Sequence, residues 1–155
     1  MKFDVFEVVE PKFPATFRQS KDVYDTMQTF AKSDREMFFI LFLNTKNRML
    51  DYVVHTIGTI DSSAVYTRDV IRSAVVHNAS SIIICHNHPS GDPEPSECDM
   101  EITRILVTAC EIVGIQILDH VIIGNGKYYS FADAGLIEDY KCKADNNLRQ
   151  ARISL

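Results

Sequence analysis

The chain has 155 residues, 46% of them hydrophobic, which is enough apolar material for the core of one domain without disulfide staples. Its net charge of −5 lacks the basic excess of proteins whose main task is to bind nucleic acid. The charge therefore counts against DNA association.

The first part of the chain predicts an arm, a helix and a hairpin. Residues 1–19 contain two prolines and are expected to form an irregular arm with at most one strand, around Phe3 and Val5. The run Met37–Leu43 is unbroken and apolar, which indicates a strand buried on both faces, and Met49–Thr56 is expected to return beside it. Between arm and hairpin, Ser20 can cap an amphipathic helix with an apolar face of Val23, Tyr24, Met27, Phe30 and Ala31.

The second part alternates between helices and strands. A helix is expected from Thr67 to about Asn78, and the apolar segment 80–86 predicts the next buried strand. Residues 115–123 predict another strand, followed by a hairpin turn at 124–126 (GNG). The longest predicted helix is Ser96–Val113, which Gly114 ends, with inward positions at Ile102, Ile105, Leu106, Ala109 and Ile112.

This order of elements predicts an α/β fold in which helices cover the faces of one mixed sheet. We expect one domain at residues 20–137, with the N-terminal arm at 1–19 and a polar C-terminal tail at 138–155 that forms a helix or frays.

A histidine pair and a downstream carboxylate suggest a metal site. His86 and His88 leave the end of a predicted strand two positions apart, so both imidazoles point to the same side. A loop stiffened by three prolines (residues 89–95) returns the chain to a helix that carries Asp99. Three such ligands leave one tetrahedral position for water, as in catalytic Zn²⁺ sites, although Fe²⁺, Co²⁺ or Ni²⁺ could use the same ligands.

Each part of this pattern also has a structural explanation. Ser96 and Asp99 match a capping box, which is a common way to begin a helix. Histidines at a strand end are common on protein surfaces. A purely structural account must treat the capping box and the histidine pair as two independent coincidences in one short segment. A serine that caps the helix can also present its hydroxyl to a reacting carbonyl.

The pattern H-N-H-x₇-S-x₂-D resembles the JAMM (MPN+) metalloprotease motif, and HNHPSGDPEPS is the form found in the RadC-like JAB-domain family. The resemblance covers about Ser20–Ile137, including segments 118–124 and 129–131. It implies a three-layer, cytidine-deaminase-like α/β sandwich with one Zn²⁺ per chain. It also implies that His86, His88 and Asp99 are the metal ligands and that Ser96 stabilises the tetrahedral intermediate.

The family pattern further requires a glutamate as general base on an earlier strand. Glu36 stands immediately before the strand Met37–Leu43 and is the candidate, although an acid at a strand end is often only a solvated edge residue. Asp119 and His120 could orient a metal ligand or form a polar pair at a strand end, and the sequence leaves both interpretations open. Cys85 is expected to point away from His86 as a buried thiol.

These residues predict a zinc-dependent metallopeptidase or isopeptidase that acts on a peptide or protein. The alternative is a DNA-repair-associated accessory protein of the RadC type with a non-catalytic metal site. Many family members carry an N-terminal helix-hairpin-helix region, which residues 1–19 are too short to form. A nucleobase deaminase would need H-x-E and P-C-x-x-C, which the site segment lacks.

The sequence also allows a prediction of the cellular compartment. No apolar run is long enough to cross a bilayer, and Asp4 interrupts the region where a signal peptide would be apolar. The four cysteines form no CxxC pair, so we expect reduced thiols. Together these features predict a cytoplasmic protein that does not associate with membranes.

Overall fold

The computed structural model describes residues 13–58 and 65–153, and within them five strands form one mixed sheet. The order across the sheet is β2-β1-β3-β4-β5. β1 is antiparallel to β2 and β3, β3 is parallel to β4, and β4 is antiparallel to β5. The strands are β1 (Met37–Leu43), β2 (Met49–Ile57), β3 (Ser81–Asn87), β4 (Gln116–Ile123) and β5 (Tyr128–Ser130).

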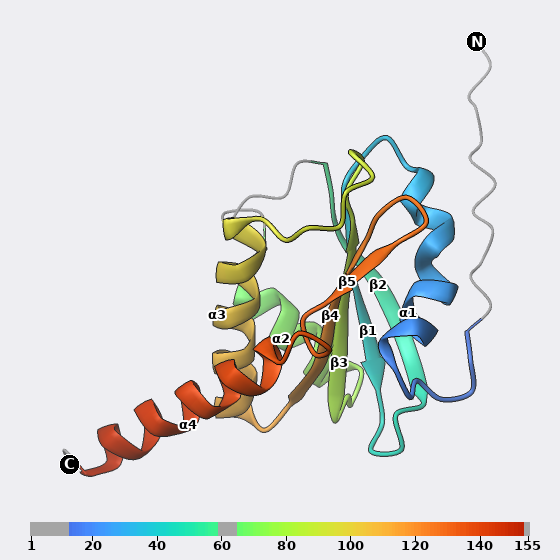
Figure 1. The fold of residues 1–155 in the computed structure, drawn as a ribbon. Helices are drawn as coiled ribbons and strands as arrows, with labels where there is room; N and C mark the ends of the chain where they lie inside the picture. Colours follow the sequence, from blue (N-terminus) through green and yellow to red (C-terminus); the bar gives the residue numbers. More distant parts are fainter. Residues whose placement is uncertain (1–12, 59–64, 154–155) are drawn as a thin grey trace.

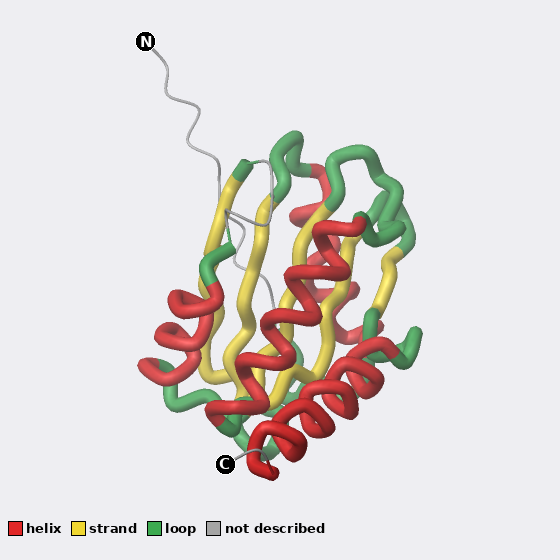
Figure 2. Tube along the Cα trace, turned by 90° about the vertical axis from the view of Figure 1, so that its left-hand side faces the viewer, coloured by secondary structure: helices red, strands yellow, loops and turns green. Residues whose placement is uncertain are grey.

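Helices cover both faces of this sheet. Figure 1 shows α1 on one side of the strands and α2, α3 and α4 on the other, and Figure 2 looks onto the second group. The prediction of a three-layer α/β sandwich is therefore confirmed. The helices are α1 (Ser20–Met27), α2 (Thr67–Val76), α3 (Glu97–Val113) and α4 (Leu136–Ile153), and a short 3₁₀ helix, η1 (Gln28–Lys32), follows α1.

The run Met37–Leu43 forms an interior strand, as its unbroken apolar character predicts. Alternate side chains of a strand point to opposite faces, so β1 contributes to both halves of the core. Toward α2, α3 and α4 it buries Phe38, Ile40 and Phe42, and toward α1 it buries Phe39, Leu41 and Leu43.

The buried face of α3 differs from the prediction. Ile105 and Ile112, expected to point inward, are 38% and 63% exposed. The buried stripe instead includes Thr103, Val107 and Cys110. The side chains of Asp99 and Thr103 are polar but hydrogen-bonded in the interior, so the buried stripe of α3 includes positions that hydrophobicity alone does not select.

The start and end of α1 also differ from the prediction. Gln19, rather than Ser20, occupies the N-cap position, and the Ser20 hydroxyl donates to Asp133 (2.5 Å) after β5. The α-helix ends at Met27 and continues as η1, where the Phe30 ring packs on the Phe39 ring at 4.6 Å. Tertiary contacts of Ser20 therefore replace its local capping role.

The C-terminal segment is helical rather than frayed. α4 packs along α3, and Ile137 and Ala144 anchor it in the core. The strand considered near Phe3 and Val5 lies outside the described residues. Across the described ranges, no helix combines the length and apolar character needed to cross a membrane.

Candidate metal centre

The strand–loop–helix segment that carries the two histidines and Asp99 meets the start of β1, which is distant in sequence, at one edge of the sheet. His86 is near the C-terminal end of β3, and His88 follows that strand. Ser96 is the N-cap of α3, with Asp99 in its first turn. Because β1 is antiparallel to β3, with Phe38 opposite His86, Glu36 lies beside the end of β3.

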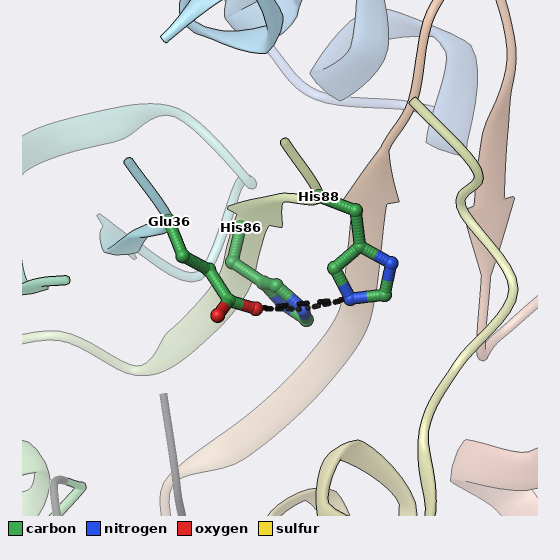
Figure 3. Close-up of side chains that lie close together, drawn as sticks. All are labelled: Glu36, His86 and His88. Carbon is green, nitrogen blue, oxygen red and sulfur yellow. Dashed lines mark hydrogen bonds and ion pairs between the residues drawn. The ribbon is translucent and has the colours of Figure 1, made fainter. Parts of the chain in front are cut away.

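The predicted site residues lie within contact distance of one another. The Nε2 atoms of His86 and His88 are 3.0 Å apart. Asp99 Oδ1 is 3.2 Å from His86 Nε2, and Asp99 Oδ2 is 3.3 Å from His88 Nε2. Glu36 Oε1 is 3.8 Å from each Nε2 atom. Figure 3 shows the Glu36 carboxylate pointing toward the two imidazole rings. Glu36, His86 and His88 alone already form a group of potential ligand atoms within 4.8 Å of one another.

The capping box of α3 also orients Asp99. The Ser96 amide and hydroxyl both donate to Asp99 Oδ2, each at 2.8 Å, and the Asp99 amide donates to Ser96 Oγ at 3.1 Å. Asp99 Oδ1 is left facing His86. The same two residues therefore cap α3 and lie beside the histidine pair, and the sequence already suggests that these two roles are compatible.

The proline-containing loop holds His88 against the hairpin between β4 and β5. The His88 amide donates to the Ile123 carbonyl at 3.0 Å, and its Nδ1 atom donates to the Asp92 carbonyl at 2.8 Å. The Asn125 amide donates to the Gly91 carbonyl at 2.8 Å. The loop and the hairpin thus place the His88 ring as one unit.

The donor set fits a metal cation. Because His88 Nδ1–H donates to a carbonyl, the Nε2 atom of the neutral ring carries a lone pair, and that lone pair faces the Asp99 carboxylate. Lone pairs and a carboxylate that point at one another repel unless a positive charge lies between them, either a metal ion or, in the metal-free protein, a proton on His88 Nε2. Their separations also match the edges of a tetrahedron, about 3.3 Å, around an ion with bonds of about 2.0 Å.

The electrostatics of the histidine–aspartate cluster are consistent with this arrangement. Hydrogen bonding to Asp99 raises the pKa of His88, against the opposing effect of burial. Burial disfavours ionisation of Asp99, but the adjacent His86 and His88 side chains hold the pKa of its carboxyl well below the usual range. The cluster therefore keeps an ionised carboxylate beside two imidazoles.

The family model of the RadC-like JAB domain matches residues 17–136. The chain belongs to the RadC-like JAB-domain family. The match contains Glu36 and the complete segment from His86 to Asp99.

Curated relatives of this RadC-like JAB domain occur in bacteria and archaea. A UPF0758 protein of Chlorobaculum parvum is 43% identical over 76% of this chain and 54% of its own length. A UPF0758 protein of Methanosarcina mazei is 42% identical over 84% of this chain and 57% of its own length. One of Vibrio atlanticus is 50% identical over 66% of this chain and 46% of its own length. The chain spans about half the length of the curated relatives it matches.

His120 and Asp119, which the sequence could not place, lie on opposite faces of β4. His120 Nε2 is 2.8 Å from His86 Nδ1, so this ring contacts a predicted metal ligand. Burial lowers the pKa of His120 well below its ordinary range, and the nearby His86 side chain lowers it further. The Asp119 carboxylate instead accepts hydrogen bonds from the Ser130 hydroxyl and the Ala132 amide, and so braces the chain after β5.

Cys85 packs on the α1 side of the sheet, away from His86. Its side chain is fully buried, and burial raises the pKa of its thiol. The expectation of a buried structural thiol in this RadC-like JAB domain is therefore confirmed.

Two further residues of the site were not predicted from the sequence. Asn87, between the two histidines, accepts a hydrogen bond from the Met37 amide (2.8 Å) and donates one to the Arg35 carbonyl (3.0 Å). It thereby holds the backbone on both sides of Glu36. Thr103, one helical turn after Asp99, contacts His120. Its only sequence signal is its i+4 spacing from Asp99 in an otherwise apolar stripe.

Proposed function

We propose that this chain is a zinc-dependent hydrolase that cleaves an amide or isopeptide bond in a peptide or protein. The observation that carries the proposal is the convergence of two imidazole Nε2 atoms and one carboxylate at 3.0–3.3 Å, with the carboxylate of Glu36 at 3.8 Å from both imidazoles. Membership of the RadC-like JAB family supports it.

His86, His88 and Asp99 would hold the ion, and imidazole with carboxylate is a donor set that suits Zn²⁺. Bound there, Zn²⁺ would lower the pKa of a water molecule to about 7 and polarise the substrate carbonyl. A site with three protein ligands has room for that water, whereas a structural zinc site is closed by four.

Glu36 is suited to move protons at this centre. Its carboxylate oxygen lies at the same short distance from both imidazoles and is therefore directed at the ligand cluster. As the water oxygen bonds to the carbonyl carbon, Glu36 would take the water's proton. It would then pass that proton to the leaving nitrogen when the carbon–nitrogen bond breaks.

Ser96 would stabilise the negative charge that develops on the carbonyl oxygen. Its hydroxyl donates to Asp99 Oδ2. A rotation about one bond would direct the same proton to the substrate oxygen, where a fixed donor lowers the energy of the transition state.

The test combines the zinc-loaded chain with a pool of peptides that includes lysine isopeptide linkages, and mass spectrometry detects new amino termini. We expect cleavage by the zinc-loaded wild type and none after chelation. Glu36→Gln should retain zinc and lose activity by about 10²-fold or more, because a neutral amide cannot accept the proton.

Zinc-loaded protein that cleaves nothing in the pool would contradict the proposal and favour the non-catalytic accessory role. Full activity in the zinc-loaded Glu36→Gln variant would remove Glu36 as the base.

A further inference from the structure

A chain of buried side chains connects two of the proposed metal ligands behind the site. His86 Nδ1 is 2.8 Å from His120 Nε2, and His120 Nδ1 is 2.6 Å from Thr103 Oγ1. Thr103 Oγ1 in turn is 2.5 Å from the Asp99 carbonyl oxygen. His86, His120 and Thr103 have no exposed surface. The connection runs from β3 through β4 to α3, so it links ligands that belong to different elements.

The direction of every hydrogen bond in this chain follows from its last member. A backbone carbonyl can only accept, so the single Thr103 hydroxyl proton points to the Asp99 carbonyl. Thr103 Oγ1 must then accept from His120, which places a proton on His120 Nδ1. A neutral His120 ring consequently has a lone pair on Nε2, and this atom accepts from His86 Nδ1–H. His86 is left with a lone pair on Nε2, the atom that faces Asp99 and His88.

The packing around His120 fixes the plane of its ring. The Phe131 ring stacks on it at 4.8 Å with an interplanar angle of 11°, and the Phe38 ring approaches edge-on at 5.9 Å. An imidazole enclosed by aromatic rings is favoured in its neutral form, because burial penalises the charged one. Packing against Phe131 and Phe38 also leaves the His120 ring little freedom to rotate away from its hydrogen-bond partners.

We propose that Thr103 and His120 are positioning residues that set the tautomer of His86, so that its Nε2 lone pair faces the ion site before any ion binds. The inference rests on the metal site of the proposed function and names residues that act on that site without touching the ion. It also makes the two ligands His86 and Asp99 a preorganised pair, since one buried chain of hydrogen bonds holds both.

His88 provides a contrast. Its Nδ1 atom donates to the Asp92 carbonyl in the surface loop, and its side chain is 15% exposed, compared with 0% for His86. This ligand is oriented by a loop carbonyl, which needs no tautomer relay. Of the two histidine ligands, a change at Thr103 should therefore affect the tautomer of His86 and leave that of His88 unchanged.

The variants Thr103→Val and Thr103→Ser form a matched pair. Valine has nearly the shape of threonine but lacks the hydroxyl, so the His120 Nδ1–H would lose its acceptor and the opposite tautomer would become competitive. That tautomer directs Nε2–H at His86 and shifts the His86 proton onto the atom that should bind the ion. Serine keeps the hydroxyl.

Zinc affinity, measured by competition with a chromogenic chelator, should fall about 10- to 100-fold in Thr103→Val, the usual scale for losing an outer hydrogen-bond partner of a metal ligand. Thr103→Ser should bind zinc within a few-fold of wild type. Equal affinity in the valine variant and wild type, or equal loss in both variants, would overturn the proposal.

A second measurement needs no substitution. Long-range ¹H–¹⁵N spectra of the metal-free wild type report which ring nitrogen of each histidine carries the proton. We expect Nδ1–H in both His86 and His120, and Nε2–H in either ring would overturn the proposal. Neither readout depends on catalysis. A protein that shows these tautomers but hydrolyses nothing would contradict the proposed function and leave this inference standing.

Discussion

At the scale of single residues, Asn87 shows how the site combines two tasks in one short segment. Its neighbours His86 and His88 supply proposed ligands, while its own amide binds the backbone at Arg35 and Met37 and so fixes Glu36 from both sides. The side chain is 1% exposed, so each of these bonds is made away from water. One strand end thus places both the ligands and the proposed base.

Replacing Asn87 should loosen the segment that carries Glu36. In Asn87→Ala the Met37 amide and the Arg35 carbonyl lose their partner, which should lower the free energy of unfolding by about 1–3 kcal/mol. Hydrogen exchange at the Met37 amide should accelerate. Asn44→Ala is the control, because Asn44 also accepts from two backbone amides but lies at the other end of β1. Unchanged Met37 exchange in Asn87→Ala, or equal acceleration in the control, would contradict this role.

Asp119 gives the fold a dependence on pH. Burial raises the pKa of its carboxyl to about 6, against the effect of the hydrogen bonds it accepts. Because the folded-state pKa is raised above the unfolded one, the contribution of Asp119 to stability is fully present below about pH 4 and is lost as pH rises through about 6. Over this pH range the contribution of Asp119 to the free energy of unfolding falls by at most about 3 kcal/mol.

Asp119→Asn removes this titration while keeping an oxygen acceptor for the amide of Ala132. Urea unfolding at pH 4 and at pH 7 should therefore show the variant gaining stability relative to wild type as pH rises. Asp139→Asn is the control, because it removes an exposed ion pair on α4 and should change the free energy of unfolding by less than about 1 kcal/mol. A difference between Asp119→Asn and wild type that stays constant over this range would refute the assignment.

At the scale of elements, the loop of residues 89–95 and the β4–β5 hairpin form one support for His88. A Cβ atom at Gly124 would lie 2.5 Å from the Gly91 carbonyl oxygen and 2.7 Å from Pro93 Cδ. Both distances are shorter than real Cβ contacts, so the loop can lie where it does only because residue 124 has no side chain.

Gly124→Ala should push this loop away and displace His88, weakening zinc binding about tenfold or more. Gly126→Ala is the control within the same hairpin. Its Cβ meets nothing within 4 Å, but its φ of +71° makes alanine strained. It should lower stability by about 1 kcal/mol while leaving zinc affinity at the wild-type value. Equal zinc affinity in the two variants would show that the contact at Gly124 does not position His88.

The elements that the sequence predicts well are those governed by local patterns. The apolar run of β1, the capping box of α3 and the GNG turn each depend on neighbours in the chain, and each appears where expected. The errors arise where distant residues decide the outcome. Ser20 binds Asp133 instead of capping α1, and the buried stripe of α3 includes the polar Thr103.

The residues of the candidate site likewise fall into two groups, those that local sequence spacing predicts and those that only the folded structure brings together. The spacing of His86, His88 and Asp99 is visible in the sequence because one strand–loop–helix segment contains all three. The proximity of Glu36 depends on the antiparallel pairing of β1 with β3, and the contact between His120 and Thr103 depends on the packing of α3 against β4. Neither follows from spacing along the chain.

At the scale of the whole molecule, the fold brings the end of β3 and the starts of β1 and α3 to one edge of the sheet, and α3 covers the hydrogen bonds behind the site. The chain spans about half the length of the curated relatives it matches, and the part that matches the family model contains all the proposed site residues. An ion bound between the end of β3 and the start of α3 should also stabilise the fold, by about 2.7 kcal/mol at a free concentration of 100 times Kd.

The most direct test of the account is zinc stoichiometry, measured by equilibrium dialysis of purified wild type, His86→Ala and Glu36→Gln. We predict one Zn²⁺ per chain in wild type and in Glu36→Gln, and none in His86→Ala, because in the proposed site His86 would bind the ion and Glu36 would act on the water beside it. Wild type without stoichiometric zinc, or His86→Ala that retains it, would contradict the central claim that these side chains form a metal centre.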